Sequence, residues 1–256
     1  WRRHFPHRQG WKKRNIFYLL LLISFAAVPV QSIRGICYDQ QVTRMEKVAR
    51  SFEPVLSQSD DQKVDVARLL AACRSYAELT QEMGQTAVAR DMESNIRKAE
   101  RLFSVAPAHE RRYLASLLEL ERKRGMHGPG GELSDSSAAA GLLWLRRSIA
   151  FQTELYSALL RSIDPKEAAL EAYRSQVQPY HGWMLRRLFT TKFLSMMPPR
   201  RDMLATLGGF PMNEFGDEEE KTTLQDLEHL VLVWRPILSH WKRTYEELDL
   251  EDTRQV

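Results

Sequence analysis

Three polar side chains in one stretch have the spacing needed to hold a hydroxyl-rich group. Asp91, Asn95 and Lys98 stand at positions i, i+4 and i+7. On a helix this spacing places a carboxylate, an amide and an ammonium group on one face. The carboxylate and the amide can each bridge neighbouring hydroxyl groups, and the lysine adds a donor. The stretch therefore predicts either a polar receptor for such a ligand or a solvated helix face with an internal hydrogen bond.

A second candidate lies at 179–183, Pro-Tyr-His-Gly-Trp, inside a helix that we expect to run from Pro165 to about Met197. A glycine in a helix interior costs about 1 kcal/mol relative to alanine, so Gly182 indicates a close approach by another segment. His181 is then either a hydrogen-bonded core residue or a ligand-binding one, and the local pattern leaves both alternatives open.

Catalysis would need more than these residues. Asp91 and His181 could form an acid–base pair, but the sequence has no Ser or Cys nucleophile motif, no HExxH and no paired-carboxylate signature. Two cysteines, Cys37 and Cys73, are too few for a structural zinc site or a disulfide scaffold, although one bridge between them is allowed. We therefore predict a protein that is not an enzyme and that uses no cofactor and no metal.

The element that must position these residues is the stretch from Ala138 to Leu160, which is rich in strong helix formers and lacks proline. We expect its N-terminus to be capped by one of the polar residues at 134–136, Ser-Asp-Ser. Trp144 lies on it beside Arg146 and Arg147, and the spacing leaves open whether this tryptophan is core packing or the floor of a site. One helical face should be core, made by the apolar side chains of Leu142, Leu145, Ile149 and Tyr156.

The rest of the chain has the pattern of helices, without a sustained alternation of β-branched and polar residues. With 256 residues, 43% of them hydrophobic, the sequence predicts one all-α domain of about eight helices. The net charge of +4 is too small for the sustained basic face of a nucleic-acid-binding protein. We expect Pro198 and Pro199 to end the helix that contains His181, and Pro236 to kink the last helix. The other expected helices span 42–56, 64–83, 87–103, 108–124 and 218–248.

The N-terminal segment differs from the rest of the chain. Residues 1–14 are a basic flank without an acid, and 15–33 hold an apolar run suited to a signal anchor, a transmembrane helix or a cleaved signal sequence. The alternative is a buried core helix with a basic neighbour. We expect the flank to stay cytoplasmic and the domain at 41–256 to be membrane-anchored or to enter the secretory pathway, so a cytosolic location is disfavoured.

Three stretches, in this order and at these separations, resemble the glycolipid transfer protein (GLTP) superfamily: DMESNIRK, GLLWLRRSIAF and YHGWMLRRLF. The similarity runs from about Val64 to the C-terminus and leaves out the N-terminal segment. The tail EELDLEDTRQV does not match the tyrosine-containing tail of the family, so we assign it no role. The resemblance implies a two-layer helical sandwich that encloses a hydrophobic lipid pocket, in proteins that move sphingolipids between membranes without covalent chemistry.

The resemblance also assigns roles to single residues. His181, with Asp91, would hold the amide of the lipid, and Trp183 would dock on the membrane surface. The lipid head group would be bound by Asp91, Asn95, Lys98 and Trp144, with the first sugar stacked on the indole. Basic residues near an exposed aromatic suit a surface of acidic lipids. The arginines expected at that surface are Arg186, Arg187, Arg200 and Arg201.

Departures from the phosphate-binding branch of the superfamily set the expected ligand. That branch resembles this chain but has a basic residue at the place of Asn95 and arginines at the places of Trp144 and Ala140. A phosphate would lack those charge-assisted partners here. We therefore expect a glycosphingolipid as ligand. The alternatives are a ceramide-1-phosphate carrier and a non-transferring lipid sensor or scaffold on the same fold.

Overall fold

The computed structural model describes residues 42–58 and 62–256. The segments expected at 1–14 and 15–33, and Cys37, lie outside these residues. The described part of the chain is helical, and it contains isolated β-bridges but no β-strand. Within that same part, no helix combines the length and the apolar character that a bilayer crossing requires. The prediction of an all-α fold is confirmed.

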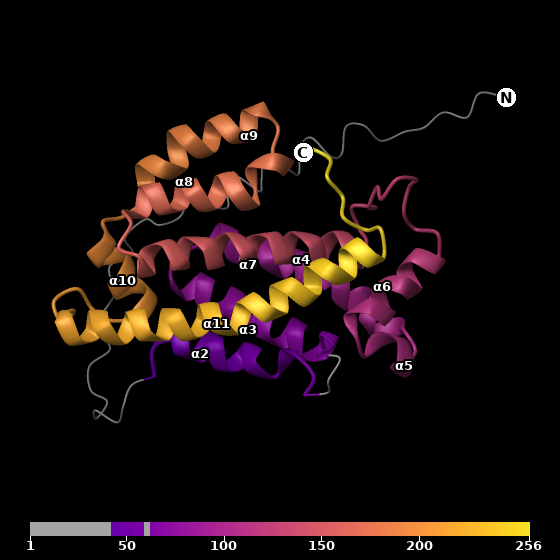
Figure 1. The fold of residues 1–256 in the computed structure, drawn as a ribbon, viewed down its shortest axis with the longest axis horizontal. Helices are drawn as coiled ribbons and strands as arrows, with labels where there is room; N and C mark the ends of the chain where they lie inside the picture. The colour runs from indigo at the N-terminus through magenta and orange to yellow at the C-terminus, as the bar shows by residue number, and fades with distance from the viewer. Residues whose placement is uncertain (1–41, 59–61) are drawn as a thin grey trace.

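Ten α-helices carry the described fold, joined by short 3₁₀ and π turns (Figure 1). The α-helices are α2 (Arg44–Phe52), α3 (Val66–Glu82), α4 (Thr86–Val105), α5 (Ala108–Arg111), α6 (Leu114–Lys123), α7 (Ala138–Leu160), α8 (Pro165–Gln176), α9 (Trp183–Leu188), α10 (Arg200–Gly208) and α11 (Asp217–Glu247). The short turns are η1 (Glu53–Val55), η2 (Gln178–Tyr180), the π-helix η3 (Phe189–Phe193) and η4 (Leu194–Met196).

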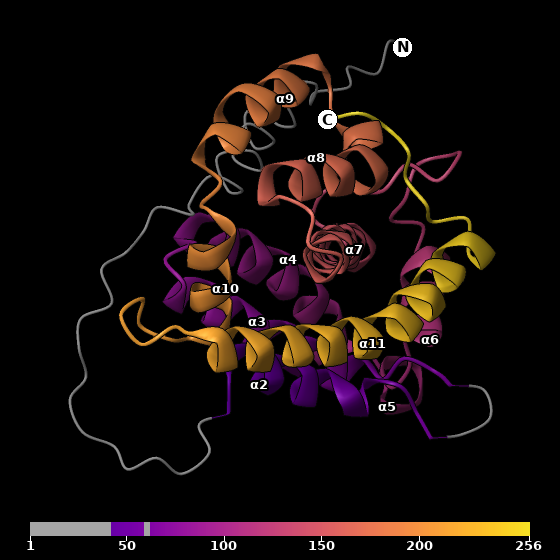
Figure 2. The ribbon, with the colours of Figure 1, turned by 60° about the vertical axis from the view of Figure 1, so that its left-hand side comes forward.

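Helix α7 is the centre of the molecule, seen end-on in Figure 2. One layer holds α4, α7 and α8 side by side, and the other holds α3, α2 and α11. The layers meet where α3 packs on α4 and where α11 packs on α7. Because α7 has neighbours on several sides, it is buried nearly all round, and not only on the expected face. Residues from both layers form one continuous apolar core.

The start of α7 is set by two polar side chains. Ser137, not the residues at 134–136, is the N-cap, and its Oγ accepts from the Ala140 N–H at 2.9 Å. The buried carboxylate of Glu121, from α6, accepts from the N–H groups of Ala138 and Ala139, each at 2.7 Å. An anionic acceptor satisfies the free amides and suits the positive end of the helix dipole. These bonds anchor α7 two turns before Trp144.

The prediction of a single helix between residues 165 and 197 is wrong. Helix α8 ends at Gln176, and α9 begins only at Trp183. Pro179 has no backbone N–H and disfavours a helical conformation in the residue before it, which explains the interruption. Gly182 is therefore not inside a helix but is the extended N-cap of α9, with φ −66° and ψ 169°. The interruption exposes the backbone at His181 and Gly182 to other partners.

Prolines also affect helices α10 and α11. The sequence pattern indicated only a helix end at Pro198 and Pro199, and it missed α10, which begins directly after Pro199. A proline ends one helix but also tolerates the start of the next, because the first amides of a helix need no intrahelical acceptor. Helix α11 contains Pro236 and continues past it as one helix, which curves along its length in Figures 1 and 2.

Candidate functional site

The predicted polar face of α4 exists as a hydrogen-bonded row. The Asn95 side-chain amide donates to the Asp91 carboxylate at 3.0 Å, and the Lys98 ammonium donates to the Asn95 carbonyl oxygen at 3.0 Å. Asn95 is 1% exposed, while Asp91 and Lys98 are partly buried. The row is therefore not a solvated surface face, and its two ends offer a carboxylate and an ammonium group to a ligand.

The protonation of Asp91 is set by its surroundings. Burial raises the pKa of Asp91 to about 7, and the Lys98 cation opposes this rise. Both forms of the carboxyl group are therefore populated near neutral pH. A ligand hydroxyl or amide that donates to this group favours the ionised form.

Helices α4 and α7 cross closely at Gly141. A Cβ atom on this glycine would lie 2.6 Å from the Asn95 carbonyl oxygen and 2.9 Å from the Lys98 Cβ. Only a residue without a side chain allows this approach, which is the physical reason for a glycine inside a buried helix. Trp144 follows three residues after Gly141 on α7.

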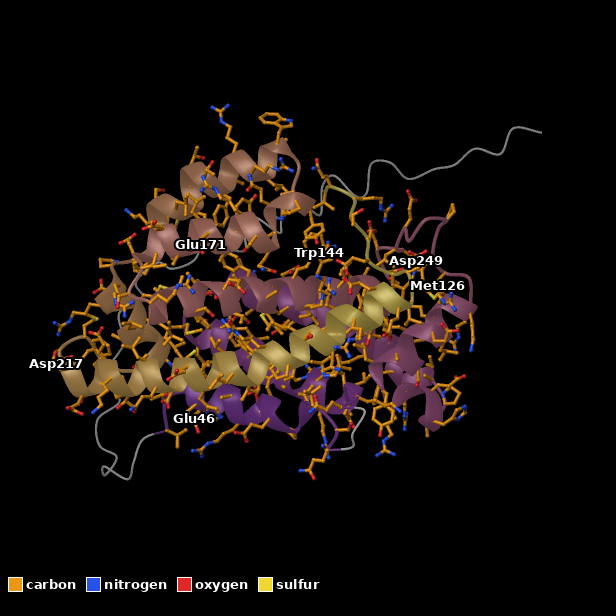
Figure 3. The ribbon with its side chains drawn as sticks, viewed as in Figure 1. Glu46, Met126, Trp144, Glu171, Asp217 and Asp249 are labelled. Carbon is orange, nitrogen blue, oxygen red and sulfur yellow. The ribbon has the colours of Figure 1, made fainter. Side chains whose placement is uncertain are left out.

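Trp144 is partly exposed, and it lies on the side of α7 that faces α8 (Figure 3). Its ring stacks with the His181 imidazole at 6.3 Å between centroids and 27° between planes. The Arg147 guanidinium lies 5.1 Å from the centre of the indole. Phe151, which lies two turns further along this helix, is fully packed against Phe189 and Phe193. Phe151 is thus core, whereas Trp144 keeps part of its surface exposed.

His181 is buried and hydrogen-bonded on its ring and on its backbone. Its Nδ1 lies 3.1 Å from the Tyr173 hydroxyl, and its carbonyl oxygen accepts from Arg186 Nε at 2.6 Å. Burial lowers the pKa of His181 to about 4, helped by the cations of Arg147 and Arg186, so the ring is neutral at physiological pH. Asp91 and His181 have separate partners, and their joint hold on a lipid amide stays a prediction.

Two buried arginines complete the site, and sequence reasoning missed their role. Arg146 and Arg147 are 6% and 4% exposed, and both donate to the Glu251 carboxylate, at 2.7 and 3.1 Å. Arg147 also donates to the Asp252 carbonyl oxygen, and its guanidinium lies 3.4 Å from the centre of the Tyr180 ring. Two adjacent arginines in a predominantly apolar helix were the signal, because buried cations require acceptors from elsewhere.

The C-terminal segment, residues 249–256, supplies those acceptors and reaches the other half of the site. The Gly182 N–H donates to the Val256 carbonyl oxygen, and the Val256 N–H donates to the Tyr180 carbonyl oxygen, each at 2.9 Å. A Cβ on Gly182 would lie 3.1 Å from the Val256 oxygen, so the expected close approach at this glycine is confirmed. Figure 3 shows Asp249 near this end of the molecule. The segment thus links α7 to the His181 backbone.

The start of α9 carries the exposed apolar side chains Trp183 and Met184, which are 73% and 52% exposed. Arg187 lies on the same helix and is exposed. The other three arginines expected near a membrane surface donate to backbone carbonyl oxygens: Arg186 to His181, Arg200 to Leu159 and Arg201 to Phe215. At α9, therefore, Trp183, Met184 and Arg187 are the exposed members of the predicted docking region.

The described residues provide neither a metal site nor a reactive thiol. Among the residues that the structure describes, no group of His, Cys, Asp and Glu could hold a metal ion. Cys73 is a buried free thiol whose pKa burial raises to about 12. A protonated thiol is a poor nucleophile and a poor metal ligand.

Solved structures with the same architecture define the class of protein. A GLTP-fold structure of FAPP2, which selects simple glycosphingolipids, superposes with a TM-score of 0.70 at 20% identity, over 84% of this chain and 100% of that one. Human ceramide-1-phosphate transfer protein in complex with 12:0 ceramide-1-phosphate gives 0.69 at 19% identity, over 83% and 100%. The fold is therefore the GLTP fold.

Sequence comparisons take the identification to a family. The family model Glycolipid transfer protein (GLTP) matches residues 64–209. Glycolipid transfer protein 3 of Arabidopsis thaliana is 26% identical over 175 residues, 67% of this chain and 70% of the relative. Glycolipid transfer protein of Danio rerio is 29% identical over 136 residues, 50% and 61% respectively. The chain belongs to the glycolipid transfer protein family, whose members transfer lipids and are not enzymes.

Proposed function

We propose that this protein binds a glycosphingolipid and transfers it between membranes. The observations that carry the proposal are the row of Asp91, Asn95 and Lys98 on α4 and the partly exposed ring of Trp144 on α7, which packs against α4. The row presents acceptors and donors to sugar hydroxyl groups, and an indole face suits the apolar side of a sugar ring. The amide of Asn95 and the indole of Trp144 give a phosphate no charge-assisted partner at these two positions.

The lipid chains need an apolar space next to the head group, and a buried row of aromatic rings begins at His181. Tyr173, which bonds the imidazole, stacks on Phe189 at 3.7 Å, and Phe189 stacks on Phe193 at 4.5 Å. Phe151 of α7 packs against the Phe189 and Phe193 rings of this row. Each CH₂ group buried here is worth about 0.8 kcal/mol. We place the lipid chains between α7, α8 and the turns at 189–196, which must move aside to admit them.

The entry of the lipid requires contact with a membrane, and we assign this contact to the start of α9. Trp183 and Met184 expose apolar surface two and three residues after His181. An exposed tryptophan beside the cation of Arg187 matches the chemistry of an interface with acidic lipids. Docking at this point would bring the membrane next to the head-group site.

The test is native mass spectrometry of the protein after incubation with vesicles that contain equal amounts of glucosylceramide, ceramide-1-phosphate and ceramide. Retention of the hexose-bearing lipid supports the proposal. Retention of ceramide-1-phosphate instead would contradict the assigned head group and favour the phosphate carrier. A folded protein that retains no lipid would favour a scaffold without lipid exchange.

We also propose that residues 1–33, which lie outside the described part of the chain, anchor or route the protein through the secretory pathway. The support is the basic flank followed by an apolar run. Protease protection of the protein made in the presence of microsomes tests this placement. A domain that remains open to protease added outside the microsomes would contradict a lumenal location.

A further inference from the structure

The buried cluster of Arg146, Arg147 and Glu251, next to the head-group site, has more positive than negative charges. Arg146 and Arg147 share the single carboxylate of Glu251. Arg146 Nη1 and Arg147 Nε are buried and have no hydrogen-bond partner. Burial, together with repulsion from Arg146, lowers the pKa of the Arg147 guanidinium, whereas Tyr180 and Glu251 oppose this. The cluster therefore has a net charge of +1, because two guanidinium groups face the one carboxylate of Glu251. It also has N–H donors that are without an acceptor.

The cluster lies close enough to the head group to influence it. The Arg147 guanidinium is 5.1 Å from the centre of the Trp144 ring, on which we place the first sugar. Charges act strongly across such distances where side chains exclude water. Arg254 of the C-terminal segment pairs with Asp252 and with Glu132, and not with Glu251. Glu251 is the carboxylate paired with Arg147, so its loss would leave the guanidinium beside Trp144 without this counter-charge.

We propose that Glu251 is a specificity-determining residue that keeps the head-group site selective for neutral sugars. Its carboxylate occupies donors of Arg146 and Arg147 that an anionic oxygen of a phosphate would otherwise attract. With Glu251 in place, a phosphorylated head meets a compensated cluster and lacks direct partners at Asn95 and Trp144. The inference rests on the proposed function, because it assumes a sphingolipid head group at Trp144.

The test compares binding of two lipids by Glu251→Gln and by the unaltered protein. The measured quantity is the ratio of affinities for ceramide-1-phosphate and glucosylceramide, each offered in phosphatidylcholine vesicles. Loss of one counter-charge near the ligand should raise this ratio about tenfold. Glu247→Gln is the matched control, because it removes the same charge from an exposed residue at the end of α11. The control should leave the ratio within twofold.

A second variant covers the case in which Glu251→Gln does not fold, since removal of one partner from a buried ion pair is destabilising. Arg146→Gln keeps the pair of Glu251 with Arg147 and lowers the charge of the cluster by one. The ratio should fall several-fold in this variant. Circular dichroism establishes which variants are folded.

The outcomes separate this inference from the proposed function. A ratio that stays within twofold of the control in every folded variant overturns the role of Glu251, even if the protein carries glucosylceramide. A protein that prefers ceramide-1-phosphate from the start contradicts the proposed ligand. Even then, opposite changes of the ratio in Glu251→Gln and Arg146→Gln would support Glu251 as the residue that sets it.

Discussion

The head-group end and the segment at 183–196 differ in how they are held. At the head-group end, hydrogen bonds hold Asp91, Asn95 and Lys98 in a row on α4, and further hydrogen bonds and ion pairs join the C-terminal segment to α7 and to residues 180–182. The segment at 183–196 instead passes from a short α-helix through a π-helix to a 3₁₀ turn and exposes Trp183 and Met184. We infer that the first region fixes the position of a ligand and that the second is the part that moves.

This difference assigns two tasks to two regions. Recognition of a head group needs donors and acceptors held in one geometry before the ligand arrives, because ordering them on binding would cost affinity. Entry of lipid chains needs an element that moves at low cost, and irregular helical turns are suited to this. The four predictions below test the division, beginning with the change of largest effect.

Removal of Asp91 or Trp144 should cause the largest loss. We expect Asp91→Ala and Trp144→Ala each to reduce the rate of glucosylceramide transfer between vesicles about a hundredfold, because a buried acceptor or a stacking ring is lost. Helical content should remain unchanged by circular dichroism. Glu93→Gln, which breaks only an exposed ion pair with Arg97 on α4, should transfer normally. Normal transfer by both Ala variants would contradict the assignment of the site.

A side chain at Gly141 should loosen the head-group end itself. The added methyl group of Gly141→Ala would collide with the Asn95 carbonyl oxygen and force α4 and α7 apart. We expect the free energy of unfolding to fall by about 2 kcal/mol, or thirtyfold in the equilibrium constant, as for other overpacked interiors. Urea denaturation measures this. Ser148→Ala on the same helix should change stability by less than about 0.5 kcal/mol, and an equally small effect at Gly141 would contradict the close crossing.

Acid should weaken binding through Asp91. The carboxylate that accepts from the ligand must be ionised, and its pKa in the free protein is about 7. Affinity is therefore fully present well above pH 7 and is lost as the pH falls through this value. Between pH 8 and pH 6 the ionised fraction, and with it the affinity for glucosylceramide, should drop about tenfold. His181 stays neutral in this range because its pKa is about 4. An affinity independent of pH would argue against Asp91 as an acceptor.

Substitution of Trp183 should have the smallest effect of the four. It should affect the task of the segment at 183–196 without affecting the head-group end. Trp183→Ala should slow transfer between vesicles several-fold, because a partly inserted indole is lost from the interface. Binding of short-chain glucosylceramide in solution should stay the same, since the head-group end is untouched. Leu232→Ala is the control, because Leu232 is also exposed, at 64%, but lies on α11. Equal slowing by both variants would mean that α9 is not the docking element.

Much of the site was accessible to sequence reasoning because it depends on spacing within single helices. The i, i+4, i+7 pattern of Asp91, Asn95 and Lys98 correctly predicted one face of α4, and the apolar stretch correctly predicted α7. Gly182 correctly indicated a close approach. The break after Gln176 and the existence of α10 were missed, because a proline both ends and starts helices and the local pattern does not say which.

The amino-acid sequence by itself determined the helical class, the polar row of α4 and the position of Trp144 on α7, because each follows from periodicity over a few turns. Only the tertiary structure decided what those residues meet. Glu251 pairs with arginines more than a hundred positions earlier in the chain, and Val256 pairs with the backbone beside His181. Such contacts have no local signature, since they arise when the packing of α7, α8 and α11 brings distant segments to one end of the core.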